Sequence, residues 1–252
     1  MVNIKLVLEY DGTNYHGWQF QPVVPTIQGE VQRALKKILK KEVTVISAGR
    51  TDAGVHAKGQ VANFKTSNLP LSPMQLLFAL NSVLPQDIRV KDVKKVPEKF
   101  HAQKSACYKI YQYLIYNDAI CRPWFRNFTW WISHPLDCEL MREAAKKLIG
   151  RHDFSSFQNQ GSPSESTVRT VEKIKIFKRK SLICIFIKAD GFLYKMVRNI
   201  VGTLVEVGRG KLSPSKMRLI LEAKDRREAG PTAPPQGLYL WRVGYPEIFD
   251  KT

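Results

Sequence analysis

Patterns typical of strands and of helices alternate irregularly along the whole chain, and this mixture most constrains the fold. Residues 3–10 place apolar side chains at every second position, which is typical of a half-buried strand. Residues 26–39 instead repeat apolar side chains at helical spacing, with Thr26 as a candidate N-cap. Regular βαβ units of about 30 residues and internal repeats are absent from the sequence. The chain therefore predicts an α+β fold with a mainly antiparallel sheet.

Further elements follow in the same mixed order. The patterns predict strands at 43–47, 60–66, 88–96, 105–117, 168–177, 182–189 and 237–245, and helices at 72–83, 137–149, 192–207 and 214–223. The polar, turn-rich segment 158–167 is expected to be an exposed loop. We expect two lobes, residues 1–104 and residues 105–252.

The charge of the chain is strongly positive. Its 252 residues include 40 Lys and Arg against 22 Asp and Glu, a formal net charge of +18. Such a field attracts polyanions, and its spread over many elements suits a folded RNA better than one small anion. The alternatives are a protein that is merely soluble and cationic, or one that binds an anionic membrane surface. No polybasic segment lies beside a long apolar run, which disfavours the membrane.

Cysteine usage and apolar runs indicate the compartment. The four cysteines form no CxxC pair, and their wide spacing suggests neither a zinc site nor a disulfide framework. The apolar run 182–187 is too short to span a bilayer, and the first residues read as a strand instead of a signal peptide. We expect a soluble, cytoplasmic protein.

The segment 48–64, AGRTDAGVHAKGQVANF, carries a carboxylate between a guanidinium and a glycine. Its glycines allow tight turns and close approach of a ligand, and Arg50 can favour the ionised form of Asp52. An ionised, fixed carboxylate can act as a nucleophile or a base. The alternative is a plain surface turn, because Asp close to Gly is ordinary turn chemistry. The loop alone does not decide between the two.

Five motifs occur together and in order, and they cover essentially the whole chain. They are YDGTNYHGWQFQ (10–21), AGRTDAGVH (48–56), FHAQKSACYKIYQYLIYN (100–117), FLYKMVRNIVG (192–202) and GLYLWRV (237–243). Together they resemble the TruA-type tRNA pseudouridine synthases. The resemblance implies the pseudouridine synthase fold, with two α/β lobes around a mixed sheet and a basic central cleft. It also implies a homodimer that isomerises uridine at positions 38, 39 and 40 of the tRNA anticodon stem-loop without cofactor or metal.

The same resemblance implies roles for three residues. Asp52 would be the nucleophile, attacking either the uracil ring or the anomeric carbon of the ribose. Tyr111 would stack on a flipped base and serve in proton transfer, although its strand position also fits a core aromatic, as it does for Tyr113. Arg198 would pair with the catalytic carboxylate, whereas the helix alone would suggest a snorkelling surface Arg.

Weaker assignments follow for other motif residues. Arg50 could orient Asp52 or hold the substrate where the target base leaves the stack, and the resemblance favours the second role. Leu238, with Leu240, would pack beneath the uracil, or both could be plain core residues. His56 is a binding candidate or a hydrogen-bonded turn residue. Tyr15 and Trp18 could stack on RNA, but such aromatics are often partly buried instead.

The chain departs from the usual family pattern next to the third motif. Gln103 stands where Arg is common, and Ile110 precedes Tyr111 where a basic residue is common. Lys104 and Lys109 can restore the charge, so the departure affects the expected local phosphate contacts more than RNA binding itself.

Two other function classes remain to be weighed against the synthase. A non-catalytic RNA-binding protein on the same scaffold would not need Asp52, Tyr111 and Arg198 together. A metal-dependent nuclease would need clustered carboxylates, which Asp11, Asp52 and Asp190 do not recognisably form. The sequence therefore favours the synthase.

Overall fold

The computed structural model describes residues 1–161 and 166–249. It divides the chain into two compact units: unit 1 consists of Met1–Cys107 and Tyr239–Thr252, and unit 2 is Tyr108–Leu238. The chain thus leaves unit 1 once and returns to it at the C-terminal end. Within the described residues, no helix is both long and apolar enough to cross a bilayer.

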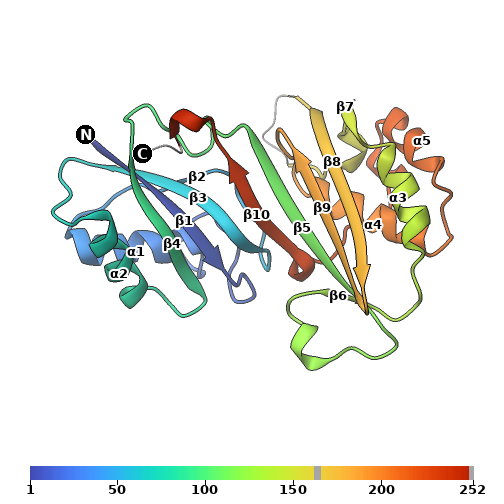
Figure 1. Cartoon of the computed structure of the whole chain (residues 1–252), viewed down its shortest axis with the longest axis horizontal. Coiled ribbons are helices and arrows are strands. Elements are labelled where there is room, and N and C mark those ends of the chain that lie inside the picture. The colour runs from blue at the N-terminus through green and yellow to red at the C-terminus, as the bar shows by residue number, and fades with distance from the viewer. Residues whose placement is uncertain (162–165, 250–252) are drawn as a thin grey trace. The chain divides into compact units, whose positions relative to one another are not determined.

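The sheet of unit 1 is built from strands β1 (Val2–Tyr10), β2 (Ile46–Ser47), β3 (His56–Thr66), β4 (Ile88–Val96) and β10 (Leu238–Gly244). Their order is β4-β1-β3-β10, with β2 beside β3 (Figure 1). The β1 strand pairs antiparallel with β3 and β4, whereas β10 runs parallel to β3. The last strand of the chain therefore lies beside a strand that begins at residue 56.

Two capped helices complete unit 1. Helix α1 (Ile27–Leu39) begins at Thr26, whose hydroxyl accepts a hydrogen bond from the Gly29 amide, as expected from the sequence. Helix α2 (Pro73–Val83) begins with a reciprocal capping box between Ser72 and Gln75. Their buried side chains join those of β1 in the core of the unit. These core residues include Ile4, Leu6, Leu8, Ile27, Val31, Leu35, Leu76 and Leu80.

The sheet of unit 2 is built from strands β5 (Tyr108–Asn117), β6 (Trp130–Ile132), β7 (Gly150–Asp153), β8 (Val168–Arg179) and β9 (Leu182–Ala189). Their order is β5-β9-β8-β7, with β6 parallel to the end of β5. The β5–β9, β9–β8 and β8–β7 pairs are antiparallel. The expected α+β class with a mainly antiparallel sheet is confirmed.

Helices α3 (Cys138–Lys146), α4 (Met196–Gly208) and α5 (Lys216–Ala223) belong to unit 2. Helix α4 is buried along nearly its whole length, and its only partly exposed side chains are Arg198 and Glu206. The register of β5 with β9 pairs Tyr111 with Ile187 and Tyr113 with Ile185. These alternate residues share one buried face of the sheet.

The structure differs from the sequence-based expectations in two details, and part of one expected loop is not described. The strand expected at 43–47 contracts to Ile46–Ser47, because Gln28 and Gln32 of α1 bond the carbonyl and the amide of Val45. The short strands β6 and β7 were not expected at all. Residues 162–165 of the loop expected at 158–167 lie outside the described residues.

Candidate active site

Asp52 lies on the connection between β2 and β3, at the end of a tight turn. The Val55 amide donates to the Asp52 carbonyl at 3.1 Å, and Gly54 between them has φ +74°, a conformation that favours glycine. The Ala48 amide donates to the Val61 carbonyl at 2.7 Å and closes the other end of the loop. Asp52 is half-buried, on a connection between paired strands. The loop is therefore held between two paired strands.

The motif at 10–21 forms a cradle for this loop through its main chain. The Trp18 amide donates to the Thr51 carbonyl at 3.0 Å, and the Gly54 amide donates to the Tyr15 carbonyl at 3.3 Å. Gly17 has φ +85°, and a Cβ there would lie 2.6 Å from the Thr51 oxygen. A Cβ on Gly12 would lie 2.1 Å from the Val55 oxygen. Two glycines of one motif therefore allow the backbone of the other to approach.

Buried polar side chains form hydrogen bonds with the residues that precede Asp52. The Tyr10 and Thr51 hydroxyls lie 2.8 Å apart, and Gln60 donates to the Gly49 carbonyl at 2.7 Å. Burial raises the pKa of Tyr10 to about 12, although its bonds to Thr51 and Gln60 oppose that rise. The residues immediately before Asp52 are therefore fixed by both main-chain and side-chain bonds.

Tyr15 and Trp18 are core residues of unit 1. Their exposed fractions are 7% and 1%, and the Tyr15 hydroxyl donates to Asp87 at 2.6 Å. Of the two roles left open by the sequence, the structure thus favours packing over stacking on RNA. Their main-chain atoms, described above, are what contact the Asp52 loop.

Arg50 and His56 flank Asp52 in very different surroundings. The Arg50 side chain is exposed, and within the described residues it makes no hydrogen bond or ion pair. His56 is only 1% exposed and stacks on Tyr239, with ring centroids 4.8 Å apart. The Gly12 amide donates to His56 Nδ1 at 3.0 Å, and the Asp11 carboxylate lies 3.1 Å from the same nitrogen. His56 thus ties the two loops together, while Arg50 is accessible to a ligand.

Two tyrosines of β5 differ in their contacts. Tyr111 is 8% exposed, and its ring meets Phe192 edge-on at a centroid distance of 4.9 Å. Tyr113 is fully buried, and its hydroxyl donates to the Pro234 carbonyl at 2.7 Å. Burial raises the pKa of Tyr113 well above its ordinary value, which keeps its hydroxyl protonated. Tyr113 is therefore a core anchor, as the sequence suggests.

Arg198 lies in the first turn of α4 and contacts the segment before β10. Its Nε donates to the Ala233 carbonyl at 2.7 Å, and the Ala233 amide donates back to the Arg198 carbonyl at 3.1 Å. Farther along that segment, a Cβ on Gly237 would lie 2.6 Å from the Tyr113 ring. Leu238 follows at once and is 6% exposed.

The candidate residues fall into two groups, one in each unit. Unit 1 contains Arg50, Asp52 and His56, and unit 2 contains Tyr111, Arg198 and Leu238. Sequence reasoning missed the supporting residues. A signal for them existed in unit 1, where the glycines of YDGTNYHGW indicate close backbone approach.

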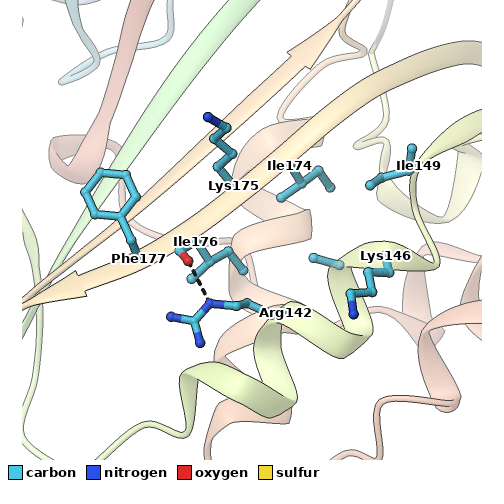
Figure 2. A pocket seen from close by; sticks show the side chains of 8 residues that line it. Arg142, Lys146, Ile149, Ile174, Lys175, Ile176 and Phe177 are labelled. Carbon is cyan, nitrogen blue, oxygen red and sulfur yellow. Dashed lines mark hydrogen bonds between the residues drawn. The ribbon is translucent and has the colours of Figure 1, made fainter.

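A separate cavity of about 320 Å³ lies between α3 and β8 in unit 2 (Figure 2). Ile174 and Ile176 supply apolar lining, and Arg142, Lys146 and Lys175 supply positive charge. Arg142 Nε donates to the Ile176 carbonyl at 2.8 Å, drawn as the dashed line in Figure 2. None of the candidate residues lines this cavity.

In the part of the chain that the structure describes, no group of three or more His, Cys, Asp or Glu side chains is placed to hold a metal ion.

Comparison with known proteins identifies relatives over the full chain. A family profile described as tRNA pseudouridine synthase matches residues 6–103 and 144–246. A protein of Thermoanaerobacter sp. (strain X514) named tRNA pseudouridine synthase A is 53% identical over 245 residues, covering 97% of this chain and all of that protein. Proteins of the same name from Acetivibrio thermocellus and Coxiella burnetii are 46% and 45% identical, covering 97% and 99% of this chain and 100% and 95% of their own. The chain belongs to the tRNA pseudouridine synthase family.

Proposed function

We propose that this protein is an isomerase that converts uridine to pseudouridine at positions 38, 39 and 40 of the tRNA anticodon stem-loop, with Asp52 as nucleophile. The observation that carries the proposal is the Asp52 loop itself. A half-buried carboxylate sits on a turn fixed by strands and glycines, in a chain that matches the family over nearly all its length. The net charge of +18 suits a polyanionic substrate.

The reaction is an internal rearrangement, so its atoms balance without any co-reactant. The bond from the ribose anomeric carbon to the ring nitrogen breaks, and a bond from the same anomeric carbon to a ring carbon forms. That ring carbon loses a proton, and the ring nitrogen gains one. Asp52 supplies the electron pair that forms the covalent intermediate, by attack on the uracil ring or on the anomeric carbon. One group must also move a proton, and Tyr111 is the candidate.

The exposed guanidinium of Arg50 suits the role at the flipped nucleotide. A target base must leave the helical stack before its glycosidic bond can be reached. An arginine beside the nucleophile can bind the phosphate of the displaced nucleotide with two donors at once. The absence of any hydrogen bond from Arg50 among the described residues supports this role over the orientation of Asp52.

We also propose roles for Arg198, Leu238 and His56, and a different observation bears on each. Arg198 is fixed by Ala233 through its Nε, which suits a guanidinium that must be held in one orientation for the carboxylate. Leu238 provides an apolar surface that suits the face of a uracil ring. The burial of His56 and its bond from Gly12 favour support of the Asp52 loop over direct contact with RNA.

The test is a substitution at the carboxylate. Asp52→Asn keeps the size of the side chain but removes its charge and turns one acceptor oxygen into a donor, and we expect it to abolish pseudouridine formation. Its affinity for tRNA should stay within about tenfold of wild type, since phosphate contacts dominate affinity. Pseudouridine mapped residue by residue in treated tRNA measures the first effect, and filter binding measures the second.

Asp92→Asn is the matched control, because Asp92 lies on β4 of the same unit and belongs to no candidate site. Activity that survives in Asp52→Asn would end the assignment of the nucleophile. A wild-type protein that binds tRNA but forms no pseudouridine would instead establish the alternative function, a non-catalytic RNA-binding protein. Modification at other uridines would correct the positions alone.

We further propose that the protein acts in the cytoplasm as a homodimer, with one tRNA reaching across both subunits. The spread of basic residues over many elements supports a large RNA footprint. Sedimentation of the protein alone and with tRNA tests the dimer. A monomer in both conditions would contradict it without affecting the proposed reaction.

A further inference from the structure

Arg226 is a partly buried arginine that pairs with no carboxylate among the described residues. Its guanidinium donates to four neutral oxygens: Asn159 Oδ1 at 3.4 Å, the Ala229 carbonyl at 3.2 Å, and Asn199 Oδ1 and Thr232 Oγ1 at 3.1 Å each. Burial lowers the pKa of Arg226, because desolvation penalises its charge. The guanidinium remains partly buried despite this penalty. We therefore look to the arrangement of its hydrogen-bond donors for its role.

The four acceptors belong to separate parts of unit 2. Asn199 lies on α4, Asn159 follows Phe157 after β7, and Ala229 and Thr232 lie on the segment 229–234, which we call the strap. The strap joins the region after α5 to the start of β10. A guanidinium has five donors in a rigid fork and no acceptor, so it can bridge several oxygens that no neutral side chain could satisfy together.

The acceptors are also bonded to one another. Asn199, which is completely buried, donates through Nδ2 to the Phe157 carbonyl and to Asn159 Oδ1 at 2.8 Å each. The Thr232 hydroxyl donates to Asn199 Oδ1 at 2.7 Å. Arg226, Asn199, Asn159 and Thr232 therefore form one connected polar cluster, the Arg226 cluster, instead of four separate contacts.

The strap packs against α4 without room for adjustment. A Cβ on Gly202 would lie 1.7 Å from the Pro231 oxygen, and one on Gly230 would lie 2.7 Å from the Thr203 Cα. The Gly230 amide donates to Thr203 Oγ1 at 2.9 Å. Beyond this contact the strap reaches Ala233, whose carbonyl accepts from Arg198 Nε.

We propose that Arg226 is a positioning residue for the isomerisation: its hydrogen bonds to Ala229 and Thr232 of the strap and to Asn199 of α4 fix the strap on that helix, and the fixed Ala233 carbonyl sets the orientation of Arg198. Asn199 and Arg198 are neighbours on α4. The Arg226 cluster and the Ala233 contact therefore bind the strap at adjacent positions of that helix. The strap ends at Pro234, whose carbonyl accepts from Tyr113, and the chain continues from there to Leu238. The kinetic part of this inference rests on the proposed function, whereas the structural part does not.

The kinetic test compares Arg226→Gln and Arg226→Lys with the matched control Arg227→Gln. Arg227 is the exposed neighbour that pairs with Asp225 outside the cluster. We expect Arg226→Gln to lower kcat about 100-fold, the effect of a small misplacement, with KM for tRNA changed less than threefold, on the order of experimental scatter. Arg226→Lys should resemble Arg226→Gln, since it keeps the charge but loses the fork.

Two kinetic outcomes would overturn the proposal. If KM rises while kcat is unchanged and Lys restores it, Arg226 contacts the RNA instead of the strap. If only the melting temperature falls and kcat per folded molecule is kept, the cluster is purely structural. Should Arg226→Gln not fold, the milder Thr232→Val removes one hydroxyl, with its bonds to Arg226 and Asn199, and should lower kcat in the same direction.

A spectroscopic readout separates this inference from the proposed function. The Nε–H signal of Arg198, assigned with Arg198→Lys, should exchange slowly with water in the wild type because it is bonded to Ala233. It should exchange at least tenfold faster, roughly the loss of one protecting bond, in Arg226→Gln and remain slow in Arg227→Gln. An unchanged rate in Arg226→Gln would overturn the inference even if the enzyme is active. A wild type without activity would refute the proposed function and leave this result standing.

Discussion

The two units hold their candidate residues by different means. In unit 1 the Asp52 loop is held mainly by main-chain bonds, from the Trp18 amide and to the Tyr15 carbonyl, with Gly12 and Gly17 allowing close approach. In unit 2 the strap is held mainly by side chains, through Arg198, Tyr113 and Arg226.

This difference determines how substitutions affect the structure of each region. Main-chain bonds survive most side-chain substitutions, so the position of Asp52, the proposed nucleophile, depends on a few glycines. A single substitution can remove each side-chain bond, so the position of the strap depends on several residues that each contribute a part of its stabilisation. The region that carries the candidate carboxylate is thus the less easily perturbed one.

The largest expected effect outside Asp52 comes from the two tyrosines of β5, which separate chemistry from anchoring. Tyr111→Phe removes the proposed proton acceptor and keeps the ring, so we expect the single-turnover rate to fall about 100- to 10,000-fold. Tyr113→Phe removes the bond to Pro234 and should cost about 1 kcal/mol of stability with a far smaller change in rate. Undiminished turnover in Tyr111→Phe would leave stacking as its only role.

A glycine pair tests whether main-chain approach positions Asp52. Gly17→Ala and Gly210→Ala both place a side chain at positive φ, which by itself should cost each about 1–2 kcal/mol in unfolding free energy. Only at Gly17 would the new Cβ meet the loop, 2.6 Å from the Thr51 oxygen, whereas nothing lies within 4 Å at Gly210. We therefore expect Gly17→Ala alone to lower kcat, by about 100-fold.

Assays well below both melting temperatures distinguish strain from misplacement. Equal kcat values for the two glycine variants would show that the loop does not depend on the cradle. The comparison between the units would then lose its main support.

The smallest expected effect is a pH dependence of stability from the support beneath the loop. Tyr10 has a folded pKa of about 12 against an ordinary value of 10.0, so it keeps its proton in the folded state while the unfolded chain loses it. Its contribution is fully present below pH 10 and is lost as pH rises toward 12. At pH 11 the loss is about 1 kcal/mol.

Urea unfolding at pH 9 and pH 11 measures this term, with Tyr10→Phe as the reference. The variant should be less stable at pH 9, because Thr51 loses its partner, yet it should lose less stability between the two pH values. The same slope for both proteins would show that Tyr10 is not the group responsible.

Much of the fold could be predicted from the sequence where local physics decides it. Thr26 and Ser72 cap their helices as expected, and the β8–β9 hairpin follows from alternation. The short strands β6 and β7 could not be predicted, because a few residues acquire strand geometry only from a partner. The division into lobes at 104 and 105 stays a prediction, while the structure assigns the segment after Leu238 to unit 1.

The candidate site divides in the same way. One short motif, AGRTDAGVH, contains Arg50, Asp52 and His56, and it identifies the loop directly. The Arg226 cluster joins residues 159, 199, 226 and 232, which have no common spacing. Nothing local marks such a network, so the sequence does not reveal it.

The sequence by itself determined the α+β class, the cationic character and the loop that carries the carboxylate, because turns, caps and periodicity act over a few residues. Only the tertiary structure decided that Trp18 and Tyr15 support this loop from the core, and that the strap fixes Arg198. Those facts depend on contacts between distant segments. Burial and hydrogen-bond geometry select such contacts, and neither exists before the chain has folded.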